Sequence, residues 1–217
     1  MARRPREHPP VQARSRETLR RLLDAAERIL ERHGLDGATL PRIASAAGVS
    51  TANVYRRFRD KDALIAAVFR RFSEMSAAEA ERPLDTESLR KLGVEELVRL
   101  WTSGLIGAYR ARPGLVRATM EYSRRHSTAP FVRRQVALES RNFDKMATVL
   151  LLFRDQIRHP DPEFAVRWAM LAAGSILRER LLLDPAHHLE HLVPACDERL
   201  REELARTVLR YLGADPG

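Results

Sequence analysis

The sequence predicts an all-α protein, and two observations support that prediction. Apolar residues recur at steps of three and four over most of the 217 residues, which is the spacing of one face of a helix. No stretch of strand length alternates strictly between apolar and polar residues, as a half-buried strand would. An apolar share of 44% and a charged share of 31% are typical of a folded chain rather than an unfolded one.

The first expected helix ends at Gly34, a residue type suited to the left-handed conformation just past a helix C-terminus. Residues 1–14 contain four Arg and three Pro, and we expect them to form a disordered basic arm, either entering a DNA minor groove or remaining a solvated tail. The apolar stripe of this first helix consists of Leu19, Leu22, Leu23, Ala26, Ile29 and Leu30.

Three further elements are expected before residue 80, each with its own start signal. A hydroxyl or carboxylate side chain can cap a helix because it accepts from the amides of the first turn, and proline is tolerated there because it has no amide to lose. The expected caps are Thr39 before Pro41, Ser50, and Asp60, and the first two of these helices end at Gly48 and Phe58.

Longer helices are expected beyond a connection at residues 82–92. Their apolar stripes run over residues 97–108, 130–158, 161–182 and 200–212, the first of them ending near Pro113.

The charge is basic and unevenly distributed. Residues 1–60 carry 13 Arg and 7 acidic residues, a balance of +6, while the rest of the chain supplies the other +3 of the net +9. A positive field of this kind attracts polyanions, although solubility alone explains it equally well. The single cysteine excludes an intramolecular disulfide and a cysteine-based zinc site. No apolar run reaches the roughly 20 residues of a membrane helix, and the start does not resemble a secretory signal, so we expect a cytoplasmic protein with no membrane partner.

The motif with the clearest function lies between Thr39 and Lys61, where two short helices flank Gly48-Val49-Ser50 as in a helix-turn-helix. Ala44 is small where the helices would cross, and Val49 and Val54 would fill the space between them. Packing therefore uses the apolar side, and the second helix could enter a DNA major groove with its polar side. The outward residues are Thr51, Ala52, Asn53, Arg56 and Arg57.

The segment from Glu17 to about Phe72 resembles the DNA-binding domain of TetR-family transcriptional regulators. The resemblance consists of G-L-D-G-A-T at the end of the first helix, I-A-S-A-A-G-V-S, Tyr55 with Phe58, and Lys61 at the start of a fourth helix. It implies a helix-turn-helix domain at residues 15–60, joined by a fourth helix to a larger regulatory and dimerisation domain at residues 61–217. It also implies a homodimeric regulator, which we expect to be a repressor, on an inverted-repeat operator in double-stranded DNA.

The resemblance assigns roles by position. Base contacts are expected from Thr51, Ala52, Asn53 and Arg56, and phosphate contacts from Thr39, Ser50, Tyr55, Arg57 and Lys61. Asn favours adenine and Arg favours guanine in the major groove. Thr51-Ala52 stands where Lys-Gly is frequent in the family, and Arg56-Arg57 replaces an aromatic or His pair, so no operator sequence can be transferred from relatives.

In the family the last two helices form the dimer, and both candidate helices here have suitable faces. The expected interface residues are Leu171, Ala172, Ser175, Leu204, Val208 and Tyr211, with packing inside one subunit as the alternative. The family also implies a small hydrophobic effector among the C-terminal helices, with Arg124, Arg125 or His126 as a polar anchor. The expected pocket residues are Trp101, Leu105, Tyr109, Met120, Tyr122, Phe143, Met146 and Trp168, with ordinary core as the alternative. A constitutive DNA binder without an effector is the rival reading.

No catalytic motif is recognisable, so we expect neither an enzyme nor a cofactor. His187, His188 and His191 form a cluster with helical spacing, but Pro185 and Pro194 bracket it as a loop and no further ligand completes a metal site. Cys196 has no neighbouring base and is interpreted as a passive thiol.

Overall fold

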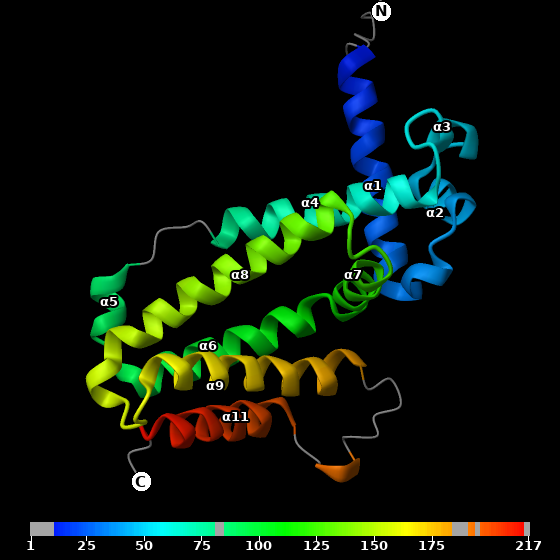
Figure 1. Ribbon diagram of the computed structural model, residues 1–217. Helices are drawn as coiled ribbons and strands as arrows, with labels where there is room; N and C mark the ends of the chain where they lie inside the picture. Colours follow the sequence, from blue (N-terminus) through cyan, green and yellow to red (C-terminus); the bar gives the residue numbers. More distant parts are fainter. Residues whose placement is uncertain (1–10, 81–84, 184–190, 194–195, 215–217) are drawn as a thin grey trace, which may run out of the picture. The chain divides into compact units, whose positions relative to one another are not determined.

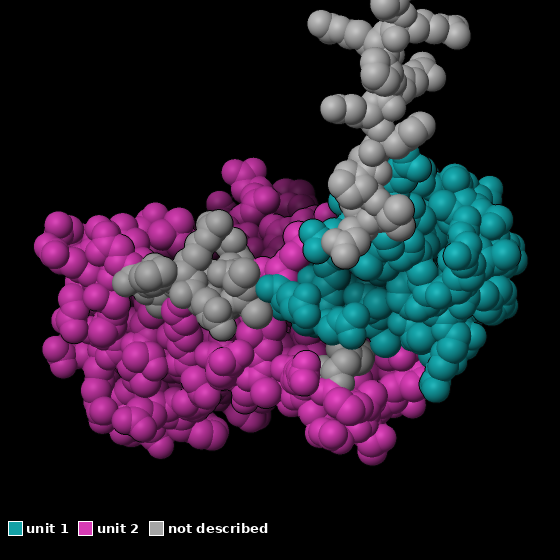
Figure 2. Space-filling view, turned by 90° about the horizontal axis from the view of Figure 1, so that it is seen from above, with its two compact units in different colours: residues 1–74 teal, residues 75–217 magenta. Residues whose placement is uncertain are grey.

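Every regular element in the computed structural model is a helix, within residues 11–80, 85–183, 191–193 and 196–214, which are the residues that the structure describes (Figure 1). The predicted all-α class is therefore confirmed. The chain divides into two compact units, residues 1–74 and 75–217 (Figure 2). In the described ranges, no helix is long and apolar enough to cross a membrane.

Unit 1 contains α1 (Val11–Gly37), α2 (Leu40–Ala47), α3 (Thr51–Tyr55) and most of α4 (Lys61–Ala80). α1 packs on α2, and α2 packs on α3. The predicted division at residue 60 differs from the compact unit because the first half of α4 belongs to the core of unit 1. This core is made by Leu22, Ala26, Leu30, Ile43, Ala44, Val54, Leu64, Ile65, Val68 and Phe69, all nearly inaccessible to solvent.

The two ends of α1 differ from the sequence prediction in opposite ways. The helix already includes Val11–Arg14, so the last four residues of the predicted arm are helical, while residues 1–10 lie outside the described residues. At the other end, Gly34 has φ 63° and ψ −168°, which interrupts the helix where a stop was predicted. A residue with a side chain rarely adopts positive φ, and the glycine removes that steric cost.

Unit 2 is formed by the remaining helices. These are α5 (Thr86–Arg90), α6 (Gly93–Ala111), α7 (Pro113–Arg125), α8 (Pro130–Leu150), η1 (Leu151–Gln156), α9 (Pro162–Arg178), η2 (Glu179–Leu183) and α11 (Asp197–Leu212). α11 packs along both α6 and α9, and these three helices lie side by side in Figure 1. Their shared core includes Leu97, Val98, Val166, Ala169, Ala173, Leu204, Ala205 and Val208.

Three helix boundaries in unit 2 correct the sequence prediction. α5 lies inside the stretch predicted as a connection, because the Asp85 carboxylate accepts from the Ser88 amide and caps a short helix. α7 is a separate helix that begins directly at Pro113, where the α6 stripe ends. The long helix predicted over residues 130–158 changes at Leu151 into a 3-10 helix.

Candidate nucleic-acid interface

The helix-turn-helix begins with a capped and tightly closed α2. The Thr39 hydroxyl accepts from the Arg42 amide at 3.4 Å, and Pro41 lies in the first turn. At the other end Gly48 has φ 65° and ψ 38°, the left-handed conformation, and its amide donates to the Ser45 carbonyl at 3.1 Å. The predicted cap and the predicted stop are both confirmed, since each depends on contacts within a few residues.

α3 is short and its direction is fixed from both ends. The Ser50 hydroxyl accepts from the Asn53 amide at 3.3 Å, which confirms the predicted cap. The regular helix ends at Tyr55 rather than at Phe58, although the Phe58 amide still donates to the Val54 carbonyl at 2.9 Å. Val54 is fully buried and attaches α3 to the core of unit 1.

The opposite side of α3 faces solvent. Ala52, Asn53, Tyr55 and Arg56 are exposed, while Thr51 is half-buried. The prediction that packing uses the Val54 side and leaves the polar side outward is therefore correct. Among the described residues, the side chains of Asn53 and Arg56 have no hydrogen-bond or ion-pair partner, so their polar groups are available to base edges.

The residues predicted to contact phosphates already have roles inside unit 1. The Arg57 guanidinium donates to the Ser15 hydroxyl at 3.2 Å, and the Lys61 ammonium donates to the Leu35 carbonyl at 2.6 Å. Lys61 therefore satisfies a carbonyl near the end of α1 and keeps two further N–H donors for another acceptor. Tyr55 is 56% exposed.

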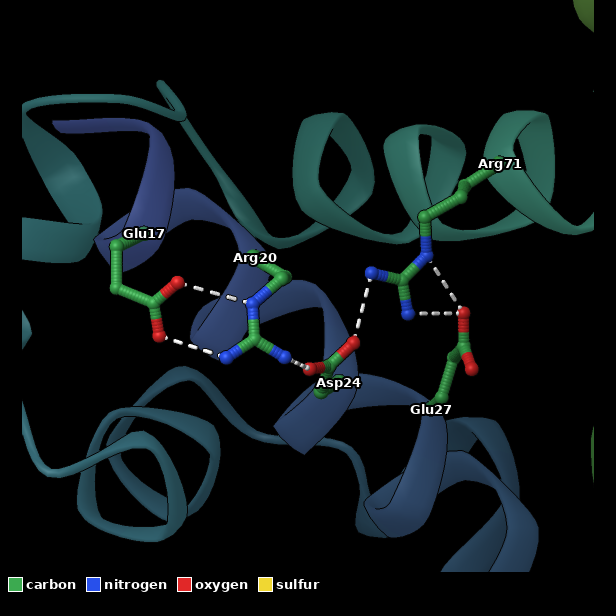
Figure 3. A network of polar contacts seen from close by, with 5 residues as sticks. All are labelled: Glu17, Arg20, Asp24, Glu27 and Arg71. Carbon is green, nitrogen blue, oxygen red and sulfur yellow. Dashed lines mark hydrogen bonds and ion pairs between the residues drawn. The ribbon is translucent and has the colours of Figure 1, made fainter. Parts of the chain in front are cut away.

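A charged network that the sequence did not reveal connects α1 to α4 (Figure 3). Arg71 of α4 donates to Glu27 and forms an ion pair of 2.8 Å with Asp24, both on α1. Arg20 continues the network, at 3.0 Å from Asp24 and 2.7 Å from Glu17. The spacing of Arg20 from Glu17 and Asp24 on α1 is a local signal, but Arg71 lies 44 residues beyond Glu27 and no sequence pattern connects it to α1.

The electrostatics of this network favour the charged forms. Partial burial alone lowers the pKa of Arg71, but the hydrogen bonds to Glu27 and Asp24 outweigh that cost and leave its pKa raised. The hydrogen bond from Arg20 lowers the pKa of Glu17. A guanidinium shared between two carboxylates is pre-organised and holds α4 against α1.

The assignment of two residues of unit 2 to the dimer interface is wrong. Leu204 and Val208 of α11 are 3% and 4% exposed, because α11 turns that face toward α6 and α9 inside the same unit. Leu171, Ser175 and Tyr211 are exposed, as an interface requires, and Ala172 is half-buried.

The assignment of one residue to the effector pocket is also wrong. Trp168 is half-exposed on the outer face of α9, where its ring stacks with that of Phe164 at a centroid distance of 5.9 Å. Tyr122 is buried and stacks on His126 at 4.0 Å. The half-buried residues Trp101, Leu105, Tyr109, Phe143 and Met146 pack against the core of unit 2, and Met120 is half-buried on α7.

The other candidate sites receive little support. His191 and Cys196 are exposed, while His187 and His188 lie outside the described residues. Arg124 is exposed, and Arg125 is bonded to Glu121 one turn earlier on α7.

A protein with a capped helix-turn-helix in one unit and a helical bundle in the other has the architecture of a bacterial transcriptional regulator. A family model described as "Bacterial regulatory proteins, tetR family" matches residues 22–68. An HTH-type transcriptional repressor of Mycobacterium tuberculosis is 43% identical over 63 residues, covering 29% of this chain and 34% of that protein. The matched part thus spans about a third of that relative. Residues 22–68 of this chain therefore match the DNA-binding part of TetR-family proteins, and the relatives that the chain resembles there are transcriptional regulators.

Solved structures resemble the fold over nearly the whole chain. A transcriptional regulator of Streptomyces coelicolor aligns over 91% of this chain and 99% of its own, with a TM-score of 0.61 and 22% identity. A regulator of Saccharomonospora viridis, solved in complex with choline, aligns over 90% of this chain and 96% of its own, with a TM-score of 0.63 and 18% identity.

Proposed function

We propose that this chain is a DNA-binding transcriptional regulator that reads duplex DNA with α3. The observation that supports this most is the two-sidedness of α3, whose Val54 side is buried while Asn53 and Arg56 are exposed. A short helix fixed in this way can lie in a major groove, which is wide enough to admit it. In this proposal Asn53 and Arg56 read bases together with Thr51 and Ala52.

Selection from a random-sequence duplex library tests this function and yields the operator. Arg56→Ala is then compared with the wild type on the selected operator and on its single-base variants. A base reader loses about 1–3 kcal/mol on the preferred sequence and discriminates less at one position. An equal loss on every sequence would instead assign Arg56 to the phosphate backbone. Failure of the wild type to enrich any sequence would contradict the proposed readout.

The phosphate contacts in this proposal come from Tyr55, Arg57 and Lys61, with the Thr39 and Ser50 hydroxyls at the helix caps. A hydroxyl that accepts in a cap can still donate its own proton to a phosphate oxygen. Arg57 and Lys61 are oriented by their bonds to Ser15 and Leu35, which reduces the entropy lost on binding.

We also propose a homodimer, formed through the outer face of α9 and the Tyr211 side of α11. Phe164, Trp168 and Leu171 are 53%, 50% and 53% exposed at helical spacing, and Ser175 continues the same face. A contiguous apolar stripe of this size is typical of an interaction surface. Two copies related by a dyad would present two α3 helices to successive grooves of an inverted repeat.

Sedimentation of Leu171→Glu tests the dimer. The wild type is expected to sediment with the mass of two chains at micromolar concentration, and the variant with the mass of one, because a carboxylate would be desolvated at the interface. Glu163→Gln changes an exposed residue directly before Phe164 that is not part of the stripe; it is the control and should leave the dimer intact. A Leu171→Glu protein that remains dimeric would exclude this face.

We propose further that the protein is a repressor, and that a small hydrophobic effector bound in unit 2 releases it from its operator. Repressors occur among the relatives, and one structural neighbour holds choline. The half-buried aromatic residues Trp101, Tyr109 and Phe143 would line the site. A thermal-shift screen of hydrophobic and cationic compounds separates this from constitutive DNA binding, because stabilisation by a bound compound raises the melting temperature. Any compound that stabilises the protein should also weaken operator binding.

A further inference from the structure

Arg21 of α1 reaches the turn of the helix-turn-helix. Its Nη1 lies 3.8 Å from the position that a Cβ would occupy at Gly48, the residue that closes α2. Arg21 and Gly48 are both exposed. A guanidinium from outside the motif therefore stands beside the turn that leads into α3.

α1 also contacts the chain at the C-terminal end of α3. The bond from Arg57 to the Ser15 hydroxyl joins the chain just after α3 to α1. Two points of α1, Ser15 and Arg21, are thus next to the two ends of the segment that carries α3.

The acidic residues nearby on α1 direct their hydrogen bonds to arginines other than Arg21. Glu17 interacts electrostatically with Arg21, but both oxygens of its carboxylate accept hydrogen bonds from Arg20. Asp24 is shared between Arg20 and Arg71 (Figure 3). The hydrogen bonds of these carboxylates thus go to Arg20 and Arg71, and the N–H groups of Arg21 have no acceptor among the residues that the structure describes.

From this arrangement we propose that Arg21 binds a DNA phosphate beside the helix-turn-helix turn, as a positioning residue that the motif itself does not include. This inference rests on the proposed DNA binding by α3. An arginine at this place holds the backbone next to the groove that α3 enters, and it carries no base information, because a phosphate is the same at every base pair. Its planar guanidinium can donate two parallel hydrogen bonds to one phosphate.

The test measures the salt dependence of binding with labelled duplexes, one of the selected operator and one of shuffled sequence. For Arg21→Gln, the slope of log K against log salt should become shallower by about 0.9 for each Arg21 in contact. Affinity should fall by the same factor for the operator and its single-base variants. Arg21→Lys should restore most of the slope, because the charge alone supplies that effect.

Arg28→Gln is the matched control. It removes the same charge, and Arg28 is exposed on α1 two turns beyond Arg21. It should bind like the wild type. If Arg21→Gln and Arg28→Gln behave alike while the wild type binds its operator, the Arg21 contact is refuted and α3 readout stands. If the wild type binds no duplex even at about 50 mM salt, the function and the contact both fail. A thermal melt confirms that each variant is folded.

Discussion

Replacement of Arg71 by Met should loosen α1 from α4 in unit 1. Removing one partner of a buried ion pair costs about 3–5 kcal/mol, and an exposed pair contributes about 0–1 kcal/mol. The side chains of Arg71, Glu27 and Asp24 are 25%, 12% and 31% exposed. The network is therefore partly buried, and its energy should lie between those of a buried and an exposed pair. The expected loss is therefore about 2 kcal/mol in the free energy of opening.

Amide hydrogen exchange measured peptide by peptide is the suitable assay, because both tryptophans lie in unit 2 and their fluorescence does not report on unit 1. A loss of about 2 kcal/mol corresponds to roughly 30-fold faster exchange in peptides of α1 and of the first half of α4. Arg70→Met changes the exposed neighbouring arginine and is the control. Exchange in α6 and α11 should not change with either variant.

A double-mutant cycle with Glu27→Gln decides whether the network is the cause. If Arg71→Met costs as much in the Glu27→Gln background as in the wild type, the two side chains are not coupled and the reasoning is refuted. The pH gives a second check. Because the pKa of Arg71 is raised, its contribution is complete below the ordinary arginine pKa and is lost only as pH rises through the raised value. The difference between wild type and variant should therefore be the same at pH 7 and pH 9.

Three further predictions concern single residues. Gly48→Ala should lower the free energy of unfolding of unit 1 by about 1 kcal/mol, measured by urea-dependent hydrogen exchange, because φ is 65° there. Acidification should remove the stabilising bond of Glu17 as pH falls through its lowered pKa, and Glu17→Gln should abolish that part of the acid sensitivity of α1 exchange. Burial raises the pKa of Tyr109. In a pH titration followed by tyrosinate absorbance, Tyr109→Phe should therefore remove a transition above the ordinary tyrosine pKa. Loss of a transition at or below the ordinary tyrosine pKa would contradict this.

Local rules predicted the helix-turn-helix well. The caps at Thr39 and Ser50 and the left-handed Gly48 each depend on atoms within about four residues, so a single sequence contains the whole cause. The exposed side of α3 followed from the burial of Val54. By contrast, the bond from Lys61 to Leu35 and the bond from Arg71 to Glu27 join residues 26 and 44 positions apart, and no sequence pattern specifies which helices meet.

The burial of one face of α11 and the exposure of Trp168 on α9 show a second limit. A helical stripe reveals that a face is apolar but not which neighbour covers it. The prediction assigned Leu204 and Val208 to a second subunit, whereas α6 and α9 of the same chain already cover them. Trp168 was expected inside because it is large and apolar, yet it lies on the outside of α9.

The distribution of side-chain size on α9 has a physical explanation that supports the proposed dimer. Its buried face carries Ala165, Ala169 and Ala173 beside the larger Val166, Met170 and Leu177. The three alanines let α9 approach its neighbours closely. The aromatic area is then placed outside, on Phe164 and Trp168. Leaving half of a tryptophan in water forfeits about 100 Å² of burial, or about 2.5 kcal/mol, in each chain. A second copy of the same face would recover that energy in both chains, whereas in a monomer the exposed half of Trp168 stays in water.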